Sequence, residues 1–464
     1  MPYEVIVVGG GLGGLTTAAL LSARGLNVCL FERASPAGGC VSNFEFQGYM
    51  FEPTAGLYSG WEPGGIYDRI FSELTVPPPE VRRASSPYTV RMPDRADVVV
   101  VDNTEQFECS LRQSFPECGE KPVSFYRQLA NALDQDGLLL QQITPKLFTD
   151  RTSRFCLFVE AQLQMFAQTS IQECTWSAAA AVLLAPQRGV FEIAGGAESL
   201  AASLSQAIRN AGGTIRLDTP VLRLAYGADE SPVGVDLLTG ERAVATRAII
   251  SNLTIWDTYG KLIGLRRTPS NIASDLRARQ SWGAYLLFLA LDQSVSSRLS
   301  SDRFLAAGDL TSSDAGFPPR HFFFAAAPQW DKRAPDGKRA VTVWNWTDVR
   351  EWFTFHEDNE KLEQMDQHYL EHFWSELHEA LPELGDGVEI IETATPQTYY
   401  ERTRRKLGMV GHSARRLTAT KDDSFKTIYP NVFVIGDTIN DSPGIAAVSS
   451  AALGLANHLT SNRS

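Results

Sequence analysis

The sequence predicts an α/β protein in which a doubly wound, Rossmann-like domain is interrupted by a second, mixed α/β domain. Three observations support this fold class. The chain opens with a β-branched run, a cluster of glycines and an Ala/Leu-rich segment, which is typical of a β-α-β unit. A second αβ pattern begins near residue 195, and another strand with a small-residue helix lies near the C-terminal end. The 464 residues suffice for two or three domains of about 150 residues each.

The N-terminal unit follows the order strand, turn, helix, strand. Val5–Val8 is a β-branched run suited to a strand that is buried on both faces of a parallel sheet. A helix is expected over Leu15–Ala23, and Gly25 ends it. Val28–Phe31 is expected to be the second strand. Together these elements form one β-α-β unit.

The later αβ pattern returns the chain to the same domain. An amphipathic helix is expected over 198–210, followed by strands at 214–217, 221–225, 233–237 and 248–251. Two intervening regions differ in character, since one begins after a triple proline and the other is rich in aromatic residues and ends in a charged helix. We therefore assign to the first domain residues 1–80, 190–265 and 405–464, and to a second, inserted domain residues 81–189 and 266–404.

The charge balance excludes one class of partner. Acidic residues number 54 against 42 basic ones, which gives a formal net charge of −12. A nucleic-acid-binding surface has to be basic to neutralise phosphates, so no nucleic-acid partner is expected. The same balance argues against tight electrostatic docking on anionic lipid.

Cysteine spacing and hydropathy predict a cytoplasmic protein. None of the six cysteines forms a C-x-x-C pair, so neither a disulfide framework nor a zinc site is expected. The chain has no signal-peptide pattern and no run of about 18 apolar residues. Peripheral membrane contact stays open. A helix around 155–168 is its candidate, and core packing explains the same apolar stripe equally well.

The glycines after the first strand predict a dinucleotide site. Gly9, Gly11 and Gly14 form G-x-G-x-x-G between a strand and a helix, the context in which this motif binds a pyrophosphate. The first glycine permits the tight turn, the second lets the phosphates approach and the third lets the helix pack closely. The N–H groups at the helix start then face the phosphates.

Glu32 ends the second strand, 23 residues after Gly9. A carboxylate at this place accepts hydrogen bonds from the ribose hydroxyls of an adenosine. Because it would repel a 2′-phosphate, it disfavours NADP. The β-α-β unit alone does not separate NAD from FAD.

The next segment distinguishes FAD from NAD, because it resembles a known group of proteins. Glu32-Arg33 is followed by Gly38-Gly39 and then by Gly48-Tyr49-Met50-Phe51-Glu52, which resembles the FAD-dependent amine oxidase and phytoene desaturase superfamily. The resemblance implies FAD, with the second glycine pair along its pyrophosphate. Arginine is common after that pair in the superfamily, whereas this chain has Cys40, as in the carotenoid isomerase branch.

The C-terminal region is similar to the same superfamily. A strand over 431–435 ends in Gly436-Asp437, and a small-residue helix follows Pro443-Gly444. The resemblance places Asp437 on the ribityl chain and Ile445-Ala446 at the pyrimidine end of the flavin, where a helix N-terminus stabilises negative charge. It implies a glutathione-reductase or amine-oxidase type of FAD domain. The predicted cofactor-binding residues are Gly9, Gly11, Leu12, Gly13, Gly14, Glu32, Arg33, Gly38, Gly39, Cys40, Val41, Val221, Gly436, Asp437, Gly444, Ile445 and Ala446.

Three internal segments resemble carotenoid cis–trans isomerases and desaturases, namely 248–262, Thr395–Thr398 and 407–411. The resemblance implies FAD-dependent desaturation or isomerisation of a carotenoid or related isoprenoid polyene, with saturation by relatives such as retinol saturases also open. Such a substrate needs a dry apolar tunnel, which the inserted, aromatic-rich domain is expected to supply.

Two alternatives remain open at this point. A polar loop over 439–442 would suit an amine-oxidase-like enzyme with a more polar substrate. The second alternative is a non-enzymatic lipid carrier, because Rab GDP-dissociation inhibitors have a similar fold and bind prenyl lipids without FAD chemistry.

The sequence names no catalytic residue, because a hydride step depends mainly on geometry and the flavin. Candidate proton acceptors are Glu52, Glu401 and His412, each with a surface or structural role as the more frequent alternative. His368 and His372 fit H-x-x-E-H on one helix face. A zinc site needs a third ligand and a cleft, so this helix is interpreted as a solvated face and no metal is expected.

Overall fold

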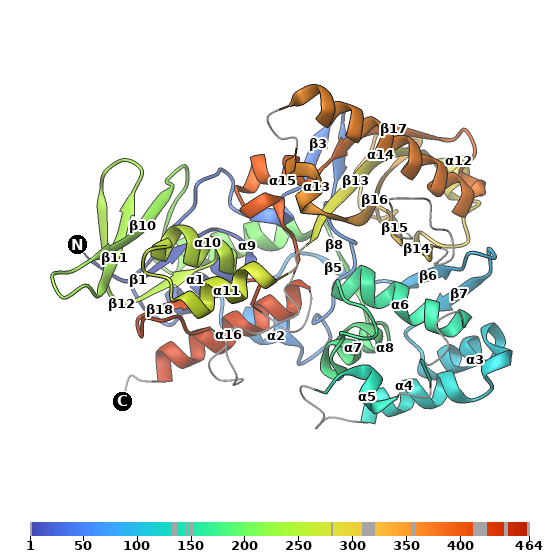
Figure 1. Cartoon of the computed structure of the whole chain (residues 1–464), viewed down its shortest axis with the longest axis horizontal. Coiled ribbons are helices and arrows are strands. Elements are labelled where there is room, and N and C mark those ends of the chain that lie inside the picture. Colours follow the sequence, from blue (N-terminus) through green and yellow to red (C-terminus); the bar gives the residue numbers. More distant parts are fainter. Residues whose placement is uncertain are drawn as a thin grey trace.

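The computed structural model describes residues 2–131, 138–144, 147–148, 153–279, 282–308, 321–354, 358–411, 425–439 and 444–461. Their elements form two lobes, each built on a seven-stranded sheet (Figure 1). One lobe carries both ends of the chain. The other combines the second sheet with a group of helices.

The first sheet has the order β10-β11-β12-β1-β2-β9, and β18 pairs with β12 beside it. The strands β1, β2, β9, β12 and β18 pair in parallel, whereas β10 and β11 form an antiparallel extension. Val5 to Val8 are buried, as expected for a central parallel strand. The bounds are β1 (Tyr3–Val8), β2 (Val28–Phe31), β9 (Thr214–Arg216), β10 (Val221–Tyr226), β11 (Pro232–Leu237), β12 (Arg242–Ser251) and β18 (Val432–Val434).

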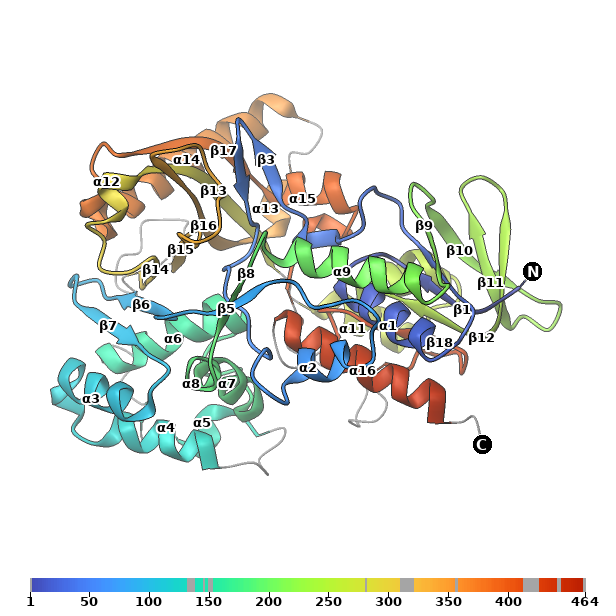
Figure 2. The same ribbon diagram turned by 180° about the vertical axis from the view of Figure 1, so that it is seen from behind.

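Helices cover both faces of this sheet. On one face pack α1 (Leu12–Ala23), α2 (Ile66–Phe71), α9 (Ala197–Asn210) and α16 (Ile445–Ser461) (Figure 2). On the other lie α10 (Ile255–Asp257), the π-helical segment η3 (Thr258–Gly264) and α11 (Ser270–Ala278). The predicted β-α-β unit is therefore present, although α1 begins at Leu12 rather than Leu15.

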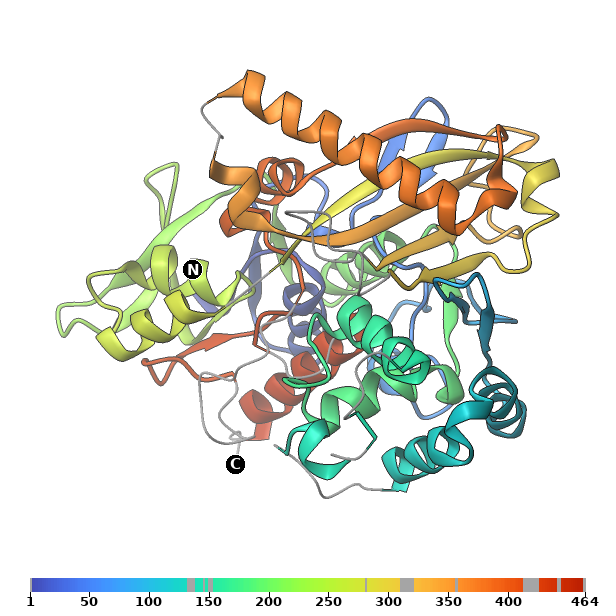
Figure 3. The ribbon, with the colours of Figure 1, turned by 45° about the vertical axis from the view of Figure 1, so that its right-hand side comes forward.

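The second sheet has the order β17-β13-β16-β15-β14-β6-β7. Along β13, Tyr285, Leu287 and Leu289 face α14, and Leu286 and Phe288 face the other side. Both faces are therefore buried. The long orange helix α14 lies across one face of the sheet (Figure 3). The bounds are β6 (Tyr88–Arg91), β7 (Asp97–Val100), β13 (Trp282–Asp292), β14 (Arg303–Ala306), β15 (Phe322–Ala326), β16 (Lys338–Asp348), β17 (Val388–Ala394) and α14 (Asn359–Ala380).

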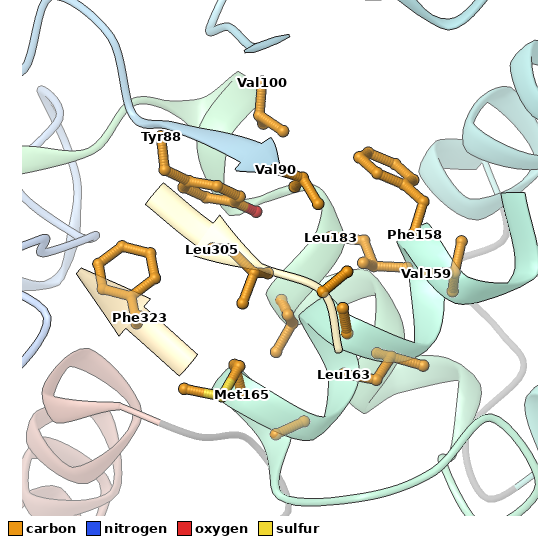
Figure 4. Close-up of a cluster of buried hydrophobic side chains, with 14 of the residues drawn as sticks. Tyr88, Val90, Val100, Phe158, Val159, Leu163, Met165, Leu183, Leu305 and Phe323 are labelled. Carbon is orange, nitrogen blue, oxygen red and sulfur yellow. The ribbon is translucent and has the colours of Figure 1, made fainter. Parts of the chain in front are cut away.

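A helical group packs beneath this sheet. It consists of α3 (Thr104–Ser114), α4 (Lys121–Asn131), α5 (Leu140–Ile143), α6 (Arg154–Ala167), α7 (Trp176–Leu183) and α8 (Ala185–Arg188). Phe155, Phe158, Val159 and Leu163 of α6 are at most 1% exposed and lie in the core with strands β6 and β14 (Figure 4). The stripe considered for membrane contact is thus core, and Phe166 beside it is half-buried.

Shorter elements connect the lobes. The hairpin β3 (Phe44–Phe46) and β4 (Tyr49–Phe51) falls in the range predicted for the first domain, yet Phe44 and Phe51 stack on Phe288 of the second sheet. The predicted domain limits stay a prediction. The remaining elements are β5 (Val81–Arg83), β8 (Phe191–Ile193), α12 (Gln293–Ser296), α13 (Val349–Thr354), α15 (Pro396–Thr403) and the 3₁₀ turns Gly39–Val41, Pro116–Cys118, Pro382–Leu384 and Lys406–Gly408. No helix of the described residues is long and apolar enough to cross a bilayer.

Candidate functional site

A cavity of about 1000 Å³ runs from the carboxyl end of the first sheet into the second lobe. This volume lies at the upper end of the roughly 300–1,000 Å³ that is usual for ligand sites. One half is lined by the glycine turn, Glu32 and residues 436–437 and 444–446, and the other by side chains of α6, β13 and β16. The two lobes therefore share one site.

The turn after β1 is built for close approach. Gly9 has a φ of +99°. The segment that contains Gly38 lies beside the turn, because Gly11 and Gly38 form a parallel β-bridge. A β carbon on Gly11 would lie 2.7 Å from Nδ2 of Asn252, and one on Gly14 would overlap the Gly9 carbonyl oxygen. Gly14 lies behind the turn and does not line the cavity, so its role is packing, as the motif predicts.

Asn252 is a site residue that the sequence reasoning missed. Its N–H donates to the Val8 carbonyl (2.8 Å) and its side chain occupies the space beside Gly11, Gly13 and Gly14. Asn252 also lines the cavity. Its position directly after β12, at the edge where the parallel strands end, is a signal that could have identified it.

Glu32 reaches the turn from the end of β2. Its Oε2 accepts a hydrogen bond from the Gly10 N–H (2.6 Å) and its Oε1 accepts from the Ala34 N–H (2.8 Å). The carboxylate is half-buried and lines the cavity. These two bonds hold the carboxylate at the mouth of the turn, where a ribose would lie.

Asp437 lies three residues after the end of β18 and pairs with Arg405. Nη2 of Arg405 donates to Oδ2 of Asp437 at 2.7 Å, and Nε donates to the Met409 carbonyl at 2.5 Å. Burial by itself would lower the pKa of Arg405, but Asp437 and Cys40 outweigh it and raise the pKa. The guanidinium is therefore a permanent cation on the cavity wall.

The start of α16 closes the same half of the cavity. Gly436 and Gly444 both have positive φ (+142° and +90°), and Ile445 and Ala446 line the wall. All of the predicted cofactor-binding residues except Gly14 line this cavity, namely Gly9, Gly11, Leu12, Gly13, Glu32, Arg33, Gly38, Gly39, Cys40, Val41, Val221, Gly436, Asp437, Gly444, Ile445 and Ala446.

The half of the cavity in the second lobe is apolar. Trp344 and Trp346 project from β16 with ring centroids 4.9 Å apart, and Tyr88 and Phe166 form a second aromatic pair at 5.2 Å. Of the described residues that line the cavity between 88 and 190 or between 284 and 346, none is Asp, Glu, Lys, Arg or His. They are Tyr88, Met165, Phe166, Gln168, Ala181, Val182, Ala185, Pro186, Val190, Ala284, Leu286, Trp344 and Trp346.

The candidate proton acceptors lie elsewhere. Glu52 is buried outside this cavity in an ion pair with Arg333 (2.8 Å), so its role is structural. Glu401 is exposed on α15 and does not line the cavity. His412 falls outside the described residues.

The H-x-x-E-H pattern lies on α14, where His372 pairs with Glu376 at 3.2 Å. Over the described part of the chain, no group of three His, Cys, Asp or Glu side chains is placed to hold a metal ion.

A match to a protein-family model shows which family the chain belongs to. The model described as "Flavin containing amine oxidoreductase" matches residues 12–446, which is most of the chain. The chain belongs to this family. Flavin amine oxidoreductases carry a flavin, and the glycine turn, Glu32 and the start of α16 are the parts of the cavity that suit a dinucleotide.

Curated relatives and solved structures agree with the family. The chain is 22% identical to prolycopene isomerase 1 from an Oncidium hybrid cultivar (96% of this chain, 82% of the relative). It is equally 22% identical to all-trans-retinol 13,14-reductase of Danio rerio (94% and 82%). A crystal structure of an oxidoreductase from Methanosarcina mazei has a TM-score of 0.68 at 17% identity, covering 97% of this chain and 99% of that one. The fold is that of flavin-dependent oxidoreductases.

Proposed function

We propose that this flavin oxidoreductase binds FAD and acts on a carotenoid or related isoprenoid polyene, by desaturation or by cis–trans isomerisation. The observation that carries the proposal is that one continuous cavity has a dinucleotide-type half in one lobe and an uncharged aromatic half in the other. Relatives that are named prolycopene isomerase and retinol reductase support the substrate class.

The residues present fit FAD. The N–H groups of the glycine turn suit the pyrophosphate, Glu32 suits the adenosine ribose and Asp437 suits the ribityl chain. Gly444, Ile445 and Ala446 suit the pyrimidine end, because a helix start stabilises negative charge. When bound, FAD supplies hydride acceptance and donation.

The protein's own contribution to the reaction is to orient the substrate and to exclude water. Trp344, Trp346 and Phe166 provide apolar surface along the second half of the cavity. An extended hydrocarbon gains free energy from such surface at about 25 cal/mol per Å² buried. No acid–base side chain is assigned. The described residues of this half include no Asp, Glu, Lys or His, and the Tyr88 hydroxyl donates to Oε1 of Gln162 (2.8 Å).

The same half disfavours a cationic amine. A buried ammonium group needs a carboxylate partner to offset the loss of its hydration. Glu32, Asp257 and Asp437 are the carboxylates that line the described cavity, and all three belong to the dinucleotide half. A neutral, apolar substrate therefore fits better than a diamine.

The test is to mix the FAD-loaded protein anaerobically with a polyene hydrocarbon, a retinoid or a diamine, in the oxidised and then in the reduced state. If the reaction is a desaturation, the polyene should bleach the oxidised flavin. If the reaction is an isomerisation or a saturation, the polyene should be converted only after the flavin has been reduced. Bleaching by the diamine, with every polyene unchanged, would contradict the proposal.

Replacement of Phe166 by Glu is expected to lower kcat/KM for the polyene by about tenfold to hundredfold, because a carboxylate in the apolar wall loses hydration when substrate enters. Phe166 is half-buried, so the protein should still fold. FAD content should stay at the wild-type level, since the residue belongs to the other half of the cavity. Phe166→Leu is the matched control and should keep most of the activity.

A further inference from the structure

The glycine pair at Gly38-Gly39 is followed by a residue without charge. Cys40 lines the dinucleotide half of the cavity and adjoins the turn, because Gly39 packs against Gly11. A pyrophosphate in this place brings two negative charges into a cavity that already holds Glu32 and Asp437. Backbone N–H groups alone offset only part of that repulsion, so a cation at this wall would strengthen binding.

A cation shares this cavity wall with Cys40, and it comes from far along the chain, since Arg405 lines the same half of the cavity. Burial raises the pKa of the Cys40 thiol, and the nearby Arg405 guanidinium opposes that shift through charge and hydrogen bonding. The Arg405 side chain is 16% exposed, whereas Lys261 on the same wall is 58% exposed. Arg402 and Arg404, also on this wall, are exposed.

The Arg405 guanidinium is held in one orientation. Asp437 and the Met409 carbonyl take its Nη2 and Nε donors. Neither of these two bonds uses Nη1. A fixed, half-buried guanidinium with a remaining donor edge is well suited to a phosphate oxygen.

We propose that Arg405 is the cationic ligand of the FAD pyrophosphate, in place of the side chain that Cys40 does not provide. The inference rests on the proposed function, because it needs FAD in this cavity. Arg405 also neutralises Asp437, so that the carboxylate can orient the ribityl chain without repelling the phosphates.

The test uses the full-length apoprotein and measures the FAD dissociation constant by flavin fluorescence at several salt concentrations. Arg405→Gln is expected to weaken FAD binding by about 10- to 100-fold. Its affinity should also depend less steeply on salt than that of the wild type, because one phosphate–cation contact is gone. A purely structural role would lower affinity without changing the salt slope.

Three further variants complete the test. Adding Cys40→Arg to Arg405→Gln should restore both affinity and salt slope, since it returns a cation to the same wall. Arg405→Lys should keep the slope. Arg242→Gln is the control, because the exposed Arg242 side chain pairs with Asp236 and neither residue lines the cavity. Thermal unfolding of each apoprotein verifies folding.

The outcomes separate the two proposals. If the wild type binds no FAD, the proposed function fails and this inference fails with it. If the wild type binds FAD and Arg405→Gln binds it equally well, or more weakly with an unchanged salt slope, only the role of Arg405 is overturned.

Discussion

Replacement of Arg333 by Met is expected to lower the free energy of unfolding by about 3–5 kcal/mol. Arg333 is 3% exposed and pairs with Glu52 (2.8 Å) and Asp331 (2.7 Å), while its Nη2 donates to the Ile193 carbonyl. Without the guanidinium, Glu52 is left as a buried carboxylate among weaker partners. Urea unfolding of the apoprotein, followed by tryptophan fluorescence, measures the loss.

The effect should be specific to this buried network. Arg350→Met is the matched control, because Arg350 pairs with Asp348 but is 74% exposed, and exposed pairs contribute about 0–1 kcal/mol. Adding Glu52→Gln to Arg333→Met should recover part of the stability by removing the unpaired charge. Equal effects of Arg333→Met and Arg350→Met would contradict the structural role given to Glu52.

Replacement of Gly14 by Val is expected to abolish retention of flavin and to cost about 3 kcal/mol of stability. A β carbon at this position overlaps the Gly9 carbonyl oxygen and lies 3.1 Å from Cβ of Asn252. Both neighbours belong to the turn and strand end that form the dinucleotide half, so neither can move without opening the turn. The ratio of flavin absorbance to protein in the purified variant measures retention.

Gly454→Ala is the control for this substitution. Gly454 lies on the exposed side of α16, and nothing is within 4 Å of a β carbon built there. Alanine should stabilise the helix by about 0.5–1 kcal/mol and leave flavin content unchanged. Normal flavin content in Gly14→Val would refute the packing role assigned to the third glycine.

The dinucleotide half could be predicted from the sequence because its signals are local. The glycine turn lies between β1 and α1, and Glu32 follows β2, so a few adjacent residues determine the geometry. The flavin family was indicated in the same way, by short motifs at both ends of the chain. Periodicity likewise predicted α9 and β9 to β12 to within a few residues, although β12 begins earlier than expected.

The rest depends on contacts between distant segments. The sequence offers Glu52 as a candidate base, whereas in the structure it is paired with Arg333, which lies 281 residues later in the chain. Arg405 could not be assigned from sequence, because its proximity to Cys40 arises only when the segment after α15 returns to the glycine turn. The apolar stripe on α6 is compatible with a membrane-facing surface and with a core position. In the structure it packs against β6 and β14 and therefore belongs to the core.

The most direct test of the central claim is an absorption spectrum of the purified protein, oxidised and then reduced, with the released chromophore identified by mass. The account predicts flavin bands near ~450 nm that bleach on reduction, and FAD as the chromophore. A colourless protein that added FAD cannot reconstitute would contradict it and would favour a lipid carrier without flavin chemistry.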